Sequence, residues 1–80
     1  MFPMANINQV ICRYIYKNWI EKSKSQRSFA IEHNIEESVV RKIKKVALGE
    51  EDYNIPVITL QRICEAKDIT LEEFFRLIKR

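Results

Sequence analysis

The most concentrated charge in this 80-residue chain is a basic run, Arg41-Lys42-Ile43-Lys44-Lys45. Lysine and arginine at this density can bind the phosphates of a polyanion, or they can form the solvated face of a helix. Residues 1–49 hold nine Lys or Arg and four Glu, a net +5, whereas residues 50–80 hold five Lys or Arg and seven Asp or Glu, a net −2. This asymmetry favours a polyanion partner for the basic half of the chain.

The cysteines, the acidic pairs and the single histidine are not spaced as in a catalytic or metal-binding motif. Cys12 and Cys64 stand 52 positions apart without a Cys-x-x-Cys motif, which indicates buried apolar thiols rather than a metal site or a disulfide. The acidic pairs at 36/37, 50/51 and 72/73 are adjacent residues, which a helix turns about 100° apart, so they form no catalytic dyad. His33 is expected to fill the edge of a core. We therefore expect no enzyme, no metal site and no cofactor.

The distribution of apolar residues bounds the class of protein. No apolar run approaches the roughly 20 residues of a membrane span, and the segment Met1-Phe2-Pro3-Met4-Ala5 carries no signal-peptide core. We expect residues 1–80 to form a single domain in the reducing cytoplasm, with no membrane partner. That length leaves no room for a separate effector domain, so we expect no small-molecule effector.

Helical spacing of apolar residues, one glycine and the absence of a strand pattern predict a compact all-α domain of five helices. The first three predicted helices cover residues 6–22, 26–33 and 37–48. A fourth has Pro56 in its first turn and apolar residues at Leu60, Ile63, Cys64 and Ala66. A fifth runs from Thr70 to about Arg80. Asn6, Ser25, Glu36 and Thr70 are the expected N-caps, and Glu73 completes a capping box with Thr70. Asn34 and Gly49 are expected to end the second and third helices, and Asp68-Ile69 joins the last two.

Residues 26–45 form the most informative stretch. Two short helices are predicted there, the first offering Phe29 and the small Ala30 to a core and the second offering Val40 and Ile43. Asn34 turns the chain between them, and Ile35 is the apolar residue that pins the turn. This pattern is typical of a helix-turn-helix, whose second helix lies in the DNA major groove.

On these residues the chain resembles the phage-repressor family of bacterial helix-turn-helix regulators, the Cro and lambda-repressor-like group. Six matches occur in order with the family's spacing. They are Ser25-Gln26, Phe29-Ala30 and Asn34-Ile35; Val40 with Ile43; Ile55-Pro56 through Thr59-Leu60 with Arg62-Ile63-Cys64; and Ile69-Thr70-Leu71-Glu72-Glu73-Phe74-Phe75.

Three positions depart from the family pattern. Trp19 and Lys44 stand where a first-helix arginine commonly pairs with a recognition-helix glutamate, and we expect Trp19 to stack on Lys44 instead. Gly49 comes three residues later than the family's glycine, which predicts a recognition helix about one turn longer. His33 replaces an apolar residue at the end of the first motif helix.

The resemblance implies a role for each residue of the motif. The base-contacting positions are Glu37, Ser38, Val39 and Lys42, where Lys42 would donate to guanine, Glu37 would accept from cytosine and Val39 would touch a thymine methyl. Glu37 is equally explained as an acidic residue favoured at a helix N-terminus. The candidate phosphate contacts are Lys24, Gln26, Arg27, Arg41, Lys44 and Lys45.

The leading hypothesis is a sequence-specific, repressor-like regulator that binds double-stranded DNA as a homodimer. Phe74, Phe75 and Ile78 exceed what one face of a terminal helix can bury, so part of that surface is either a dimer contact or ordinary core. The alternative is a non-catalytic protein-interaction module on the same fold, with a protein partner such as a toxin or another regulator.

Overall fold

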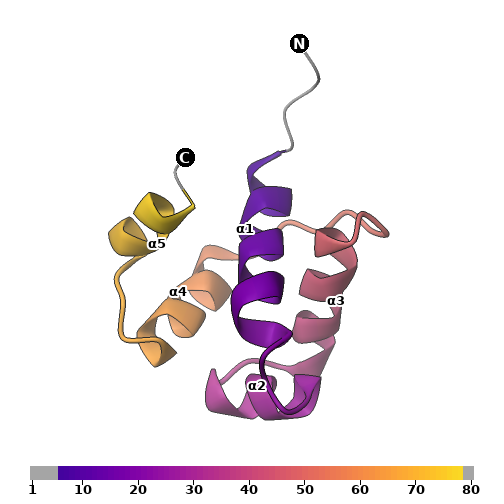
Figure 1. Ribbon diagram of the computed structural model, residues 1–80, viewed down its shortest axis with the longest axis horizontal. Helices are drawn as coiled ribbons and strands as arrows, with labels where there is room; N and C mark the ends of the chain where they lie inside the picture. The colour runs from indigo at the N-terminus through magenta and orange to yellow at the C-terminus, as the bar shows by residue number, and fades with distance from the viewer. Residues whose placement is uncertain (1–5, 79–80) are drawn as a thin grey trace.

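The computed structural model describes residues 6–78 of the chain. It contains α1 (Ile7–Ile15), a π-helical segment η1 (Tyr16–Ile20), α2 (Gln26–Glu32), α3 (Glu37–Ala47), α4 (Val57–Ala66) and α5 (Leu71–Leu77). No strand occurs within residues 6–78, which confirms the predicted all-α fold with five α-helices. In Figure 1, α1 stands at the centre with α3 on one side, α4 and α5 on the other, and α2 across one end.

Two expectations fall on parts of the chain that the structure leaves undescribed. The predicted end of the last helix near Arg80, and the N-terminal residues 1–5, lie outside the described residues. Within them, α5 extends to Leu77 and is followed by Ile78 as its C-cap.

Local sequence sets most of the helix ends. The side chains of Asn6 and Ser25 accept hydrogen bonds from the backbone N–H groups of Gln9 and Ser28, at 2.8 and 3.0 Å. Thr70 and Glu73 form the predicted capping box, in which each side chain accepts from the other residue's backbone N–H. The chain turns with positive φ after α2, α3 and α4, at Asn34, Gly49 and Asp68, with φ values of 56°, 78° and 61°. The predicted caps at Asn6, Ser25 and Thr70 and the predicted helix stops at Asn34 and Gly49 are confirmed.

The predicted helix over 6–22 is wrong in its second half. After Ile15 the chain forms η1, where the Glu21 N–H donates to the Tyr16 carbonyl at 2.8 Å, five residues back. In an α-helix Ile20 would point about 140° away from Ile15, because each residue turns about 100°. The wider turn brings both isoleucines into the core, at 0% and 5% exposure. Burial of two isoleucines five residues apart thus requires the wider π segment.

Three smaller expectations also need correction. Glu36 occupies the N-cap position of α3, but its side chain makes no capping bond; its chain is longer than those of the Ser, Asn and Asp residues that reach the first turn well. Pro56 is the N-cap of α4 rather than part of its first turn, because its ψ of 144° is extended. Ala66, expected on the apolar face of α4, is exposed.

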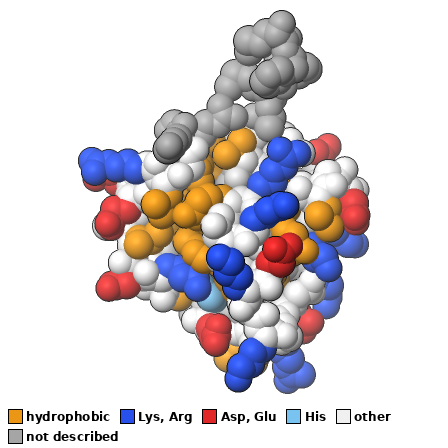
Figure 2. Space-filling model, in the orientation of Figure 1, with side chains coloured by type: hydrophobic (Ala, Val, Ile, Leu, Met, Phe, Trp, Pro, Cys, Tyr) orange, Lys and Arg blue, Asp and Glu red, His pale blue; other side chains and the backbone are white. Residues whose placement is uncertain are grey.

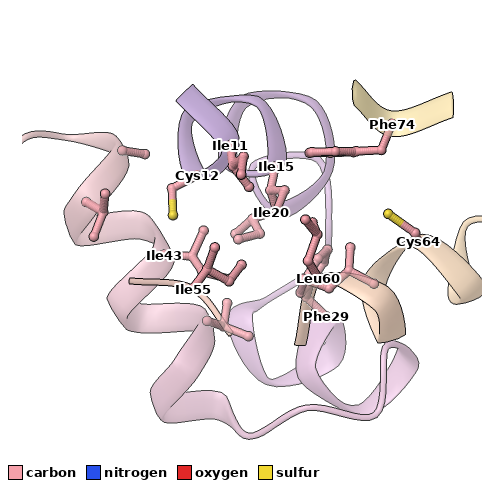
Figure 3. Close-up of a cluster of buried hydrophobic side chains, with 14 of the residues drawn as sticks. Ile11, Cys12, Ile15, Ile20, Phe29, Ile43, Ile55, Leu60, Cys64 and Phe74 are labelled. Atoms are coloured by element: carbon pink, nitrogen blue, oxygen red, sulfur yellow. The ribbon is translucent and has the colours of Figure 1, made fainter. Parts of the chain in front are cut away.

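The core lies between α1, α3 and α4, with side chains from α2 and α5 completing it (Figure 3). Its largest fully buried side chains are Phe29 from α2 and Phe74 from α5. Cys12 and Cys64 are buried and free, as expected, and burial raises the pKa of each thiol to about 11. These thiols are therefore protonated at neutral pH and act as small apolar side chains.

His33 packs in the core, as predicted, but it is buried rather than half-buried at the core's edge. Its imidazole is only 3% exposed, stacks on the Phe29 ring at 3.8 Å and places Nδ1 2.8 Å from the Phe29 carbonyl oxygen. Burial lowers the pKa of this imidazole, and nearby Lys67 adds to that effect. The neutral form is therefore favoured in the folded protein.

Aromatic side chains join η1 to α5. Tyr14, Trp19 and Phe74 form a cluster with ring centroids 5.4 to 5.8 Å apart. The expected stacking of Trp19 on Lys44 is wrong, since the ammonium over the indole ring, 5.5 Å from its centroid, belongs to Lys67. Trp19 thus faces the α4–α5 side of the molecule, away from the basic residues of α3.

Candidate nucleic-acid interface

A tight turn fixes α2 against α3. The left-handed conformation of Asn34 lets the Ile35 N–H reach back to the Ala30 carbonyl at 3.0 Å, and Ile35 then packs against the core. Ala30 is 4% exposed, and its small side chain permits close packing of the two helices. Since α3 also packs on α1, its orientation is fixed from two sides.

The outward side of α3 carries the residues expected to meet a partner. Val40 is fully buried, and residues two positions away on a helix point about 200° from it. Ser38 and Lys42 therefore face outward, and both are exposed and one helical turn apart. Their side-by-side exposure is the geometry that base reading requires.

The other two base-contacting candidates differ from this pair. Glu37 is exposed, but it lies 3.4 Å from Arg41 in an ion pair along the helix. Such a pair contributes only about 0.3–0.5 kcal/mol, so it can open on binding. Val39 is half-buried and packs against the core. The structure thus places Ser38 and Lys42 side by side. Glu37 lies about 140° from Lys42 around the helix and is paired with Arg41, and Val39 is less accessible.

Four of the six phosphate candidates surround one hollow. This hollow, of about 310 Å³, is lined by Gln26, Arg41, Lys44, Lys45, Leu48 and Glu50. Three cations, the first residue of α2 and one carboxylate, that of Glu50, thus meet beside the outward side of α3, and the net positive charge suits a backbone phosphate. Lys24 and Arg27 are exposed at the start of α2, outside the hollow. Figure 2 shows Lys and Arg side chains along the α3 side and at the α2 end of the molecule.

The connection from α3 to α4 contributes residues to which the sequence analysis assigned no function. Glu50, Glu51 and Asp52 place acidic side chains beyond the C-terminal end of α3, and all three are exposed. Further along, the Tyr53 ring is 5.2 Å from the ammonium of Lys42. An aromatic residue within a polar connection was the available signal for Tyr53.

Asn8 on α1 holds this connection in place. Its Oδ1 accepts from the Ile55 N–H at 3.0 Å, and its Nδ2 donates to the Asn54 side chain at 3.0 Å. The sequence does not indicate this role, because nothing near Asn8 shows that its side chain binds residues 46 and 47 positions away.

Residues 6–78 form neither a metal site nor a membrane span. Within this range no group of three His, Cys, Asp or Glu side chains could hold a metal ion. The helices of the same range are all too short or too polar to cross a bilayer.

Comparison with known proteins adds no relative. No protein-family model, curated protein or solved structure matches this chain.

Proposed function

We propose that this protein is a sequence-specific transcriptional regulator that binds double-stranded DNA through a helix-turn-helix formed by α2 and α3. The observation that carries the proposal is the exposed pair Ser38 and Lys42 on the outward side of α3, next to the basic hollow. Placed in the major groove, this side would present hydroxyl and ammonium donors to base edges. The cations of the hollow would neutralise phosphates on the adjacent backbone.

The sequence resemblance to the phage-repressor family supports the same proposal, and a repressor-like regulator of this kind would act in the cytoplasm. The 11-residue α3 accommodates the late glycine at position 49. The α5 helix exposes Leu77 and half-buries Phe75 and Ile78, and apolar side chains gather between α5 and α1 in Figure 2. This surface suits a homodimer contact, whose two α3 helices would read half-sites about 34 Å apart.

Selection from a random DNA pool, followed by fluorescence anisotropy with the selected duplex, tests the proposal. We expect the double change Ser38→Ala with Lys42→Ala to weaken binding at least about tenfold, because a good base contact is worth about 1–3 kcal/mol. Arg62→Ala is the matched control, since it removes one exposed charge from α4. Equal binding to all duplexes, or a double variant that binds like the control, would contradict the proposal.

The acidic connection favours one second candidate, a non-catalytic module that binds a protein such as a toxin. Exposed Glu50, Glu51 and Asp52 would meet a basic partner surface. Tight binding to a copurified protein that is lost on neutralising these three residues, together with weak DNA binding indifferent to Ser38 and Lys42, would support this candidate over the regulator.

A further inference from the structure

Lys42 differs from the other basic residues of α3 in having an aromatic neighbour. Its Nζ lies over the Tyr53 ring, 5.2 Å from the centroid. This distance is within the range at which the negative face of a ring attracts an ammonium. Lys44 and Lys45, on the same helix, make no such contact with any ring of residues 6–78.

The Tyr53 ring is itself fixed. It packs half-buried against the core, and burial raises the pKa of its hydroxyl. Two residues later the Ile55 side chain is buried, and its N–H is held by Asn8 from α1. A second hydrogen bond, from Asn8 Nδ2 to Asn54 Oδ1, holds the residue next to Tyr53. The ring thus packs on the same core as α3, and the chain beside it is tied to α1.

A fixed ring changes what a lysine can do in recognition. Lysine has a flexible stem of four carbons and loses rotamer freedom when its ammonium is held by a ligand. If a protein group already holds the ammonium, much of that loss is incurred on folding and not on binding. The ring covers only one side of the ammonium, so donors remain for a second partner.

We propose that Tyr53 is a positioning residue for base recognition, because its ring holds the Lys42 ammonium at the outward side of α3, where it can donate to a base edge. This inference rests on the DNA-binding function proposed above. It assigns the connection between α3 and α4 a part in specificity, although that connection is acidic around Glu50 to Asp52 and unsuited to touching phosphate itself.

Proton NMR without DNA tests the contact. Ring currents should shift the Hε protons of Lys42 upfield of those of Lys45, its exposed neighbour on the same side of α3. The shift should persist in Tyr53→Phe, which keeps the ring, and vanish in Tyr53→Leu. Because the wild-type spectrum alone reports the contact, a poorly folded variant would not prevent the test. Equal Hε shifts for the two lysines would overturn the proposal.

A double-mutant cycle on the selected duplex tests the consequence. Tyr53→Leu should weaken binding roughly two- to fivefold, the range of an exposed cation–π contact, and relax preference at the base that Lys42 reads. Tyr53→Phe should bind like wild type. In a Lys42→Met background, Tyr53→Leu should cause no further loss, whereas a merely structural role would weaken binding equally in both backgrounds.

The outcomes separate this inference from the function beneath it. Wild-type binding that depends on Lys42 but not on Tyr53 would overturn the positioning role and leave the regulator standing. Absence of sequence-specific binding by the wild-type protein would overturn both, even if the NMR contact is present.

Discussion

Asn8 makes the most direct quantitative prediction, because one side chain fastens two distant parts of the chain. Asn8→Ala removes two hydrogen bonds, one of which satisfies the half-buried N–H of Ile55. A hydrogen bond contributes about 1 kcal/mol net, and a buried donor left without a partner costs about 1–3 kcal/mol. Alanine returns up to about 0.7 kcal/mol through its helix propensity. We therefore expect the free energy of unfolding to fall by about 1–3 kcal/mol.

Thermal unfolding followed by far-UV circular dichroism measures this loss. For a domain of this size 1 kcal/mol lowers Tm by roughly 4–8 °C, so the variant should melt about 4–24 °C below wild type. Asn18→Ala is the matched control. It also removes an amide hydrogen bond, from Asn18 to the Tyr14 carbonyl, but that bond is local and exposed, and the change should stay within about 0.5 kcal/mol. If the two variants melt together, the connection is not held by Asn8 and the reasoning fails.

Three further predictions test the turn, the buried histidine and the basic surface. Asn34→Ala should lower the free energy of unfolding by about 1–2 kcal/mol in urea titrations while Asn34→Gly stays near wild type, because φ is 56° and only glycine enters that region without cost; equal losses would contradict the left-handed turn. Protonation of His33 opposes folding, since its folded-state pKa is lowered from 6.5. The free energy of unfolding should therefore fall as the pH drops below about 6.5, and it should fall less in His33→Gln. Identical pH profiles for the two proteins would refute the role of His33. On the selected duplex, Lys45→Gln should reduce the slope of log affinity against log salt by about 0.9, the value for one phosphate, whereas Arg62→Gln on α4 should leave it unchanged; equal slopes would exclude a phosphate contact at Lys45.

Sequence patterns anticipated the features that neighbouring residues decide. Caps at Asn6, Ser25 and Thr70 depend on a side chain and an N–H three residues away, so the pattern contains both partners. The stop at Asn34 follows from the residue's own tolerance of positive φ. The exposure of Ser38 and Lys42 follows from helical periodicity once Val40 and Ile43 are assigned to the core.

Contacts between distant segments escaped the same reasoning. The partner assigned to Trp19 was wrong because the end of α4 brings Lys67 to the ring instead of Lys44. The cap assigned to Glu36 is the local exception, since its side chain makes no capping bond. The approach of Tyr53 to Lys42 depends on the path of the connection between α3 and α4. That path is held by a hydrogen bond to Asn8, 47 residues before Ile55 in the sequence.

The amino-acid sequence by itself determined most of the helices, the caps at Asn6, Ser25 and Thr70 and the outward side of α3, because each depends on residues within one or two turns of chain. Only the tertiary structure decided that η1 widens to bury Ile20, that Lys67 covers Trp19, and that the connection carries Tyr53 to Lys42. The physical reason is that packing selects among locally acceptable conformations by burying surface and by pairing polar groups that are far apart in the sequence. The pattern of a single sequence does not indicate which of those groups will pair.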